Sequence, residues 1–333
     1  MGDWLRQYAT VSRFEFLPAT SVAILIGIFL AAPSFSELLK TQVLVTTLVG
    51  LVVFVLLFNV GFQCNCWADW EVDQTYKTHL ADSVQAMGRD RLLAVWVGHL
   101  AAAVGLTVAL AVTYSRWDLL LLVLLGTFFG VFYSIPPLRF KARGPWHAVM
   151  AFPVFTVPGA FAYLLVRPLD PTSTLGLAFV LVLSGITLAH YGLVLVSQCE
   201  DLPDDRGAGI VTPPVAYGLQ ATLRGALVLS AKGNALAGVG LALFLADAHP
   251  LLLLGGVIVL TGAYSVPLRM LLRLNVSARS GHKEKALLKE IRSVMKDYPK
   301  FHGAPLAATM VVALLRVVVL SMEWQRSLLP LPF

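Results

Sequence analysis

The chain has 333 residues, of which 57% are hydrophobic and 13% charged, and its formal net charge is +6 at pH 7. Soluble globular proteins average about 25% charged residues, so this composition excludes an ordinary soluble protein. Stretches of about 20 apolar residues, the length that crosses a bilayer, recur along the chain and indicate a multi-pass membrane protein.

Nine apolar stretches are predicted membrane spans. The fifth contains several prolines and glycines and the seventh contains Lys232 and Asn234, but membrane helices tolerate helix breakers when neighbouring groups satisfy the backbone. We therefore expect an all-α integral membrane protein with nine transmembrane helices. In chain order the spans cover 16–33, 42–63, 92–113, 118–134, 147–166, 174–196, 225–247, 250–268 and 304–323.

Basic residues are distributed unevenly between the loops. The N-terminal segment and the loops after even-numbered spans hold most of them, including a dense stretch over 269–300. Because cytoplasmic loops carry an excess of Lys and Arg, we expect the N-terminus and these loops on the cytoplasmic side. The net positive charge follows from this bias and does not indicate nucleic-acid binding. The opposite loops hold only Lys40, Arg116, Arg167 and Arg326.

A pair of motifs occurs twice at nearly the same interval. A cluster over 65–73 is followed by Tyr-Ser-Ile-Pro-Pro-Leu-Arg from Tyr133, and a cluster over 198–205 is followed by Tyr-Ser-Val-Pro-Leu-Arg from Tyr264. Each acidic cluster follows the second span of its half, and repeats in membrane proteins place their sites where the halves meet. We predict two four-helix repeats, 1–145 and 146–272, around a central cavity. A basic segment, 273–303, and a ninth helix with its tail, 304–333, follow.

The first cluster has the spacing of a helical face. Asn65, Asp69 and Asp73 are four residues apart, so all three point the same way if the second span continues through them. Carboxylate and amide oxygens suit Mg²⁺, which is usually bound by one or two carboxylates together with substrate phosphates and water. The spacing therefore predicts a magnesium site and makes these residues catalytic candidates.

The second cluster repeats this chemistry with an interruption. Gln198, Asp201 and Asp205 would also share a helical face. Pro203 lies between them, and proline in a helix interior costs about 3 kcal/mol or more. We expect the helix to break near Asp201, or to restart there with Asp201 as its cap.

Carboxylates that face one another repel unless cations are bound. With two Mg²⁺ ions in place the site would attract a polyanion such as a diphosphate, which the ions would bridge. The basic residues that we assign to diphosphate binding are Lys77, Arg139, Lys141 and Arg206. Trp67, Trp70 and Tyr133 are close enough in sequence to line an aromatic cavity that would stabilise a carbocation.

These motifs resemble the UbiA superfamily of intramembrane prenyltransferases. The run Asn65-x₃-Asp69-x₃-Asp73 matches that family's motif after its second span, and Asp201-x₃-Asp205 matches the motif after its sixth. The loop from Tyr133 to Lys141 resembles a family loop, and Arg13 resembles an arginine that often opens the first helix. The resemblance adds both Tyr133 and Arg13 to the predicted diphosphate contacts.

The resemblance implies Mg²⁺-dependent ionisation of an isoprenyl diphosphate and transfer of the prenyl group to a lipophilic, often aromatic, acceptor. Three positions depart from the family pattern. Gln198 stands where many members have Asp, Ile210-Val211 replaces a basic pair, and Asp82-Ser83 replaces an Arg-Pro pair. These departures concern the acceptor more than the diphosphate, because the carboxylates are present.

Two alternatives remain open from the sequence. A UbiA-type terpene cyclase would ionise the same substrate and cyclise it without an acceptor. A secondary transporter would also combine repeats with membrane acids, but its ionisable groups usually lie deeper than the span ends at which these acids occur. An acceptor-free assay separates the first alternative from transfer.

Residues 282–302 form a distinct segment. Leu287, Ile291, Val294 and Tyr298 recur at helical spacing between lysines and arginines, which predicts either a basic amphipathic helix at the lipid headgroups, a solvated connector or a cover for the cavity. The three cysteines lack the spacing of a structural zinc site, and no disulfide is expected.

Overall fold

The computed structural model of this protein describes residues 2–248, 250–280 and 283–328. Helices dominate this part of the chain, and its one β-bridge joins Arg143 to Val211. The longer helices are α2 (Leu17–Ala31), α4 (Thr41–Tyr76), α6 (Arg89–Tyr114), α7 (Trp117–Ser134), α8 (Val157–Val166), α9 (Thr174–Glu200), α11 (Pro213–Phe244), α12 (Pro250–Arg279) and α14 (Tyr298–Leu328). The short helices and turns are α1 (Gly2–Val11), η1 (Phe14–Phe16), α3 (Phe35–Leu38), α5 (Thr78–Met87), η2 (Phe140–Ala142), η3 (Gly144–Met150), η4 (Phe152–Thr156), α10 (Leu202–Gly207) and α13 (Glu284–Met295).

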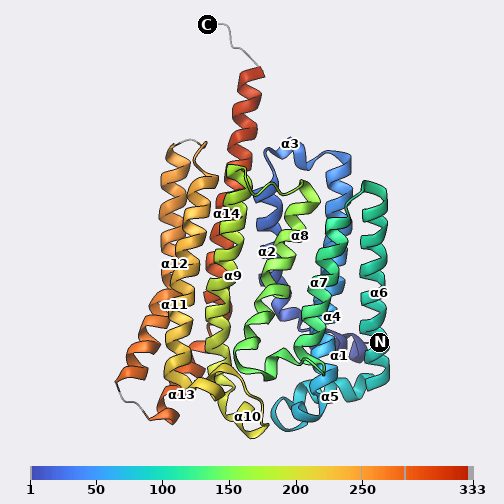
Figure 1. Cartoon of the computed structure of the whole chain (residues 1–333), viewed down its shortest axis with the longest axis vertical. Helices are drawn as coiled ribbons and strands as arrows, with labels where there is room; N and C mark the ends of the chain where they lie inside the picture. The colour runs from blue at the N-terminus through green and yellow to red at the C-terminus, as the bar shows by residue number, and fades with distance from the viewer. Residues whose placement is uncertain (1, 249, 281–282, 329–333) are drawn as a thin grey trace.

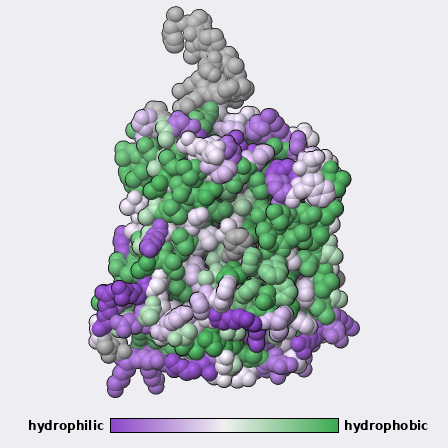
Figure 2. All heavy atoms as spheres, in the orientation of Figure 1, coloured by the Kyte–Doolittle hydropathy of each residue, from purple (hydrophilic) through white to green (hydrophobic). Residues whose placement is uncertain are grey.

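Over the described ranges, nine helical segments are long and apolar enough to cross a membrane. Each overlaps one predicted span, which confirms the all-α, nine-helix fold. The helices stand side by side, with α5, α10 and α13 at one end of the bundle and α3 at the other (Figure 1). Hydrophobic residues cover the middle of the molecule and hydrophilic ones gather towards its two ends (Figure 2). We call the end that carries α5 and α10 the motif end.

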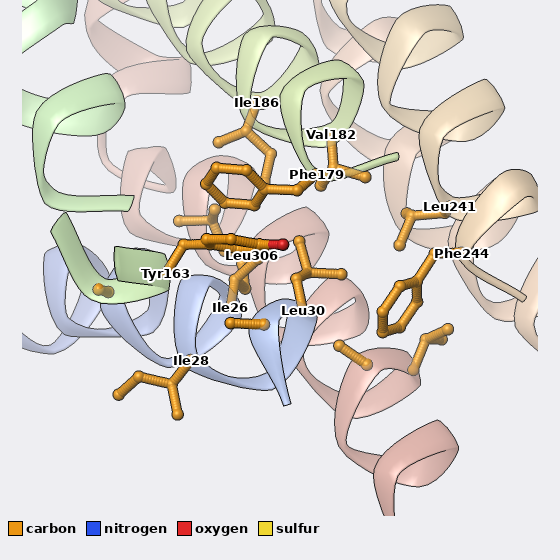
Figure 3. Packing of buried hydrophobic residues seen from close by; sticks show 14 of the residues in the cluster. Ile26, Ile28, Leu30, Tyr163, Phe179, Val182, Ile186, Leu241, Phe244 and Leu306 are labelled. Atoms are coloured by element: carbon orange, nitrogen blue, oxygen red, sulfur yellow. The ribbon is translucent and has the colours of Figure 1, made fainter. Parts of the chain in front are cut away.

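The main core joins helices from both halves of the chain. Tyr163 of α8 and Phe179 of α9 are buried with their ring centroids 4.1 Å apart. Residues of α2, including Ile26 and Leu30, and Leu306 of α14 surround them (Figure 3). This packing fixes α9, which carries the second motif, against the centre of the bundle.

The helices α9 and α11 approach each other unusually closely because glycines line their contact. A Cβ atom built on Gly185 of α9 would clash with the backbone of Ala237 in α11, and one on Gly233 would clash with Ala189. Small residues permit such close helix contacts in membranes. A larger side chain at Gly185 or Gly233 would push α9 away from α11 and displace the second motif.

The two Tyr-Ser motifs occupy different structures. After Tyr133, α7 ends at Ser134, before Pro136 and Pro137, neither of which has a backbone N–H to donate. Tyr264 instead lies inside α12, which continues through the single Pro267. The sequence similarity therefore does not extend to the local fold here, and the division into two repeats stays a prediction.

The amphipathic segment packs on the protein. In α13, Leu287 and Ile291 are buried in a cluster with residues of α9, α11 and α12, so these side chains are not available for insertion among lipid headgroups. Its basic residues, such as Lys285 and Lys289, are exposed. Residue 282, at the start of the predicted segment, and the tail from 329 lie outside the described residues. The ninth span begins at Tyr298, earlier than predicted.

Candidate active site

The first motif lies on a single unbroken helix. Because α4 runs to Tyr76, Asn65, Asp69 and Asp73 follow one another along one face, as their spacing predicts. Asp69 and Asp73 are 9% and 8% exposed. A helix of 36 residues spans about 54 Å at 1.5 Å per residue, so α4 is long enough to cross a bilayer and still carry this motif beyond its most apolar part.

The second motif lies at a junction between two helices. α9 ends at Glu200 and α10 begins at Leu202, so the predicted interruption occurs at Asp201. Pro203 falls in the first turn of α10, where its missing N–H costs little. Asp201 occupies the capping position, but its side chain makes no capping hydrogen bond. Because of this break, Asp204 and Asp205 belong to α10, which has its own axis.

Both motifs line one polar cavity of about 130 Å³. α4 contributes the three residues of the first motif, and α9 and α10 contribute Gln198, Asp201, Asp204 and Asp205 from another wall. The remaining lining residues come from α4, the segment after it, α7 and two loops at the motif end. They are Val72, Tyr76, Lys77, Tyr133, Lys141, Ala208, Ile210 and Thr212.

A second, apolar cavity of about 200 Å³ adjoins the polar one. It lies between α4, α7, α8 and the turns η3 and η4, and Asn65 and Tyr133 line both cavities. Apart from Tyr133, its aromatic lining consists of residues whose role the sequence does not predict. They are Phe54, Phe58, Phe62 and Phe161.

Trp67 and Trp70 line neither cavity. Both pack in a cluster with α1 and α5, and the guanidinium carbon of Arg89 lies 5.0 Å and 5.5 Å from their ring centroids. A carbocation in the apolar cavity would therefore meet phenylalanines and Tyr133, and not these tryptophans. Sequence proximity to the first motif was misleading here, because the two indoles point away from the face that carries the acids.

Basic side chains contact the acids of both motifs. Lys141 donates hydrogen bonds to Asp69 and, at 3.1 Å, to Oδ1 of Asn65. Arg139 Nη2 lies 3.4 Å from Asp69 Oδ1. Across the cavity, Lys77 Nζ lies 3.9 Å from Asp201 Oδ2. Three of the predicted diphosphate contacts are therefore beside the acids and compensate part of their charge.

The other two predicted basic contacts neither line the polar cavity nor pair with an acid of either motif. Arg206 pairs with Glu284 of α13 at 3.1 Å and both side chains are more than half exposed. Arg13 pairs with Glu15 at 2.6 Å and lies over the ring of Phe16. In this conformation neither arginine reaches the polar cavity, so a diphosphate role for either would require its side chain to turn.

Burial and neighbouring charges perturb the ionisable groups of the polar cavity. Burial raises the pKa of Asp201, and Lys77 opposes that shift. Burial also raises the pKa of Asp205 to about 6, against a hydrogen bond donated by Thr212 at 2.9 Å and with a further increase from Asp201. Burial lowers the pKa of Lys141, although Asp69 favours its charged form. A bound cation would relieve the repulsion among these carboxylates.

The donor set fits a hard cation that shares its coordination with a ligand. Among the described residues, no three His, Cys, Asp or Glu side chains converge on one point that could hold a metal. Two carboxylates of the first motif and three of the second do line the same cavity, and Oε1 of Gln198 is buried there without a hydrogen-bond partner. That is the incomplete protein shell with which Mg²⁺ binds together with water and phosphate oxygens.

Three lining residues with polar side chains were not predicted as site residues: Tyr76, Asp204 and Thr212. Asp204 lies off the helical face drawn from 198 to 205, and it lines the cavity because α10 has its own axis. Thr212 arrives from the loop before α11, close to the bridge between Arg143 and Val211. Only the hydroxyl and carboxylate chemistry of these residues, and no spacing rule, could have indicated them.

Comparison with known proteins agrees with this geometry. The sequence matches the family model of the UbiA prenyltransferase family over residues 20–280. This chain belongs to the UbiA prenyltransferase family. A search of curated proteins found no match.

Solved structures share the UbiA fold with this chain at low sequence identity. A structure of digeranylgeranylglyceryl phosphate synthase matches with a TM-score of 0.62 at 15% identity, over 94% of this chain and 99% of that one. A UbiA homologue from Archaeoglobus fulgidus, bound to GPP and Mg²⁺, matches with a TM-score of 0.57 at 15% identity, over 93% and 99%. A UbiA homologue from Aeropyrum pernix K1 matches with a TM-score of 0.53 at 17% identity, over 90% and 95%.

Proposed function

We propose that this protein is a Mg²⁺-dependent intramembrane prenyltransferase that ionises an isoprenyl diphosphate and transfers its prenyl group to a lipophilic, aromatic acceptor. The observation that carries the proposal is the junction of the two cavities. A polar cavity bordered by both acidic motifs meets an apolar, aromatic cavity at Asn65 and Tyr133. A charged head joined to a hydrocarbon tail matches that pair of environments.

The chain's own residues would hold the two parts of the substrate separately. Lys77, Arg139 and Lys141 would contact diphosphate oxygens, since ammonium and guanidinium groups donate charge-assisted hydrogen bonds to phosphate. The phenylalanines of the apolar cavity would surround the tail and exclude water from the developing carbocation. The C–O bond that breaks would lie at the junction, because its oxygen belongs to the head and its carbon to the tail.

The metal ligands would come from both motifs. Asn65, Asp69 and Asp73 would serve from α4, and Gln198, Asp201 and Asp205 from the opposite wall. When bound, two Mg²⁺ ions would neutralise the charge that builds on the leaving diphosphate. Lys141 and Ser134 both donate hydrogen bonds to Asn65 Oδ1, so Asn65 must exchange at least one of them to bind a metal through that oxygen.

Relatives support the substrate class. The homologue from Archaeoglobus fulgidus has been solved with GPP and Mg²⁺ and with DMAPP and Mg²⁺. Because identity to this chain is 15% and 17%, those structures support the class of ligand and leave the chain length and the acceptor to experiment.

The decisive experiment is an acceptor-free assay of the purified protein in lipid. It would be incubated with Mg²⁺ and dimethylallyl, geranyl, farnesyl or geranylgeranyl diphosphate, and released diphosphate and prenyl products would be measured. We expect turnover to require an added lipophilic acceptor and to yield its prenylated form. Release of a cyclic hydrocarbon or alcohol without acceptor would identify a terpene cyclase instead. No diphosphate release with any chain length, either without acceptor or with added lipophilic aromatic acceptors, would overturn both functions.

The orientation in the membrane is part of the proposal. The basic loops predict that the motif end and the N-terminus face the cytoplasm. Single cysteines placed at exposed Lys285 of α13 and at exposed Lys40 before α4, in a variant that lacks the native cysteines, would test it. We expect an impermeant thiol reagent added to intact cells to label position 40 and spare position 285; the reverse pattern contradicts the orientation.

A further inference from the structure

Tyr133 is one of the two residues that border both cavities, and its hydroxyl is already engaged. Its Oη lies 2.9 Å from Nε2 of His147, and the two rings meet edge to face with centroids 5.6 Å apart. His147, on the turn η3, is fully buried. The sequence predicts diphosphate contact for Tyr133, but the partner of its hydroxyl lies in the protein interior.

The direction of this hydrogen bond follows from counting unpaired groups. Nδ1 of His147 is buried without a partner, and no other hydrogen bond of the Tyr133 hydroxyl occurs among the described residues. If Nε2 carried the proton, both the phenol hydrogen and the Nδ1 lone pair would remain unpaired. If Tyr133 donates to Nε2, only the Nδ1–H remains. Because unpaired buried polar groups are unfavourable, the second arrangement is preferred.

Packing alone does not explain a histidine at position 147. A Phe of similar size would fill the same space beside Tyr133 and Tyr191 without burying an unpaired nitrogen. A buried polar group that is only half satisfied lowers stability relative to an apolar one. The presence of a histidine at this position therefore indicates a role for the hydrogen bond between its Nε2 and the hydroxyl of Tyr133.

We propose that His147 is a positioning residue that accepts a hydrogen bond from the phenol hydroxyl of Tyr133. This hydrogen bond keeps the phenol hydrogen away from the junction of the two cavities. The electron-rich oxygen and ring of Tyr133 are then left facing the carbon at which positive charge develops. This inference rests on the proposed function, since it needs a carbocation at the junction. A phenol hydrogen turned towards that carbon would repel the cation. When the phenol donates to His147 instead, its oxygen and ring carry more negative charge, which stabilises the cation.

The kinetic test is a double-variant cycle between Tyr133→Phe and His147→Phe, measured as diphosphate release under saturating Mg²⁺. We expect each single variant to lower kcat about tenfold, equivalent to about 1.4 kcal/mol of transition-state stabilisation, with KM for the prenyl diphosphate nearly unchanged. The double variant should be no slower than the slower single one, because both remove the same interaction. Additive losses, or a change confined to KM, would overturn the proposal.

The conservative variant His147→Gln separates positioning from packing. Its side-chain oxygen can accept the phenol hydrogen, so we expect it to recover most of the kcat that His147→Phe loses. If His147→Gln is as slow as His147→Phe while both melt at the wild-type temperature, the acceptor role is wrong. Should His147→Phe fail to fold, the comparison of His147→Gln with Tyr133→Phe still decides, because only the latter should be slow.

A measurement independent of turnover keeps the inference distinct from the proposed function. Solid-state NMR of ¹⁵N-histidine protein in lipid, with His147 assigned from the signal lost in His147→Gln, reports which ring nitrogen carries the proton. We expect a neutral ring protonated at Nδ1. Protonation at Nε2 would refute the inference even in an active enzyme, and a wild-type protein that releases no diphosphate would refute the proposed function whatever the tautomer.

Discussion

Lys77 and Asp201 connect the two acidic motifs: Nζ of Lys77, at the end of α4, lies 3.9 Å from Oδ2 of Asp201, between α9 and α10. The two elements are far apart in sequence and form opposite walls of the polar cavity. Both side chains are partly exposed, at 45% and 30%, so the pair contributes little to stability. The pair instead holds the ammonium group of Lys77 over the cavity, where a polyanion would bind.

Lys77→Ala should therefore weaken diphosphate binding. We expect KM for the prenyl diphosphate to rise about tenfold, the effect of losing roughly 1.4 kcal/mol of binding, with a smaller change in kcat. Steady-state kinetics would measure both values. The matched control is Lys40→Ala, which removes an exposed lysine paired with Glu37 before α4 and should leave both values unchanged. An unaltered KM in Lys77→Ala would contradict the role.

Asp69→Asn and Asp201→Asn should each abolish turnover without unfolding the protein. Asn keeps the size and one oxygen of the side chain but removes the charge that would hold Mg²⁺. We expect rates at least about a hundredfold lower, or 2.7 kcal/mol in the barrier. Melting temperatures should be recorded in parallel, since Lys141 loses its ionic partner in Asp69→Asn. Near-normal rates in saturating Mg²⁺ would show that the metal assignment is wrong.

Removal of divalent cations should stop the reaction reversibly. The carboxylates of the polar cavity would then repel one another and the substrate, apart from the compensation by Lys77, Arg139 and Lys141. We expect no diphosphate release in excess chelator and recovery on adding Mg²⁺. In the same samples, Mg²⁺ with an unreactive prenyl diphosphate analogue should raise the melting temperature more than either alone, because both would bind the folded state. Full activity in excess chelator would contradict the requirement for a divalent cation.

Gly61→Leu should change the preference for prenyl chain length. Gly61 lines the apolar cavity, a Cβ there meets no atom within 4 Å, and it lies about 6 Å along α4 from Asn65. We expect turnover of geranylgeranyl diphosphate to fall at least tenfold relative to dimethylallyl diphosphate, since the leucine fills the space beyond the first isoprene unit. Gly105→Leu, on the exposed surface of α6, is the control, and equal losses for both substrates would refute the tail assignment.

Asp247→Ala should lower stability without affecting the chemistry. Asp247 accepts hydrogen bonds at 2.8 Å and 3.0 Å from Arg316, which is 5% exposed and lies 4.3 Å from the ring centroid of Phe244. Without the carboxylate a buried guanidinium loses its ionic partner. We expect the melting temperature to fall by a few degrees and kcat to stay at the wild-type value at low temperature. An unchanged melting temperature would show that the pair is not stabilising.

The sequence predicts the helices and the first motif well because both depend on local periodicity. Nine apolar runs suffice to place nine helices, and residues four apart on an unbroken helix must share a face. The break at Asp201 is likewise local, since it follows from Pro203. The helix ends are less predictable. α4 continues beyond its apolar run through polar turns that contain neither proline nor glycine, whereas α14 begins at Tyr298, before its apolar run, although Pro299 and Gly303 lie in its first turns.

The loops and the long-range pairs could not be predicted in the same way. The outward turn of Arg206 depends on Glu284, which lies in a different helix, and the burial of Leu287 depends on the position of α13 against α9. The pairing of Lys141 with Asp69 depends on how the chain turns after Pro137. The hydrogen bond between Tyr133 and His147 joins a helix end to a turn whose conformation no sequence period encodes.

The shared border at Asn65 and Tyr133 has a consequence for how a substrate reaches its place. A molecule that fills both chambers is an amphiphile with its anionic group towards the motif end, and a bilayer holds amphiphiles with their anionic groups at its surface and their chains inside. The surrounding lipid would therefore present such a molecule already aligned with the two chambers, so that sideways diffusion within one leaflet, without reorientation, would complete its approach.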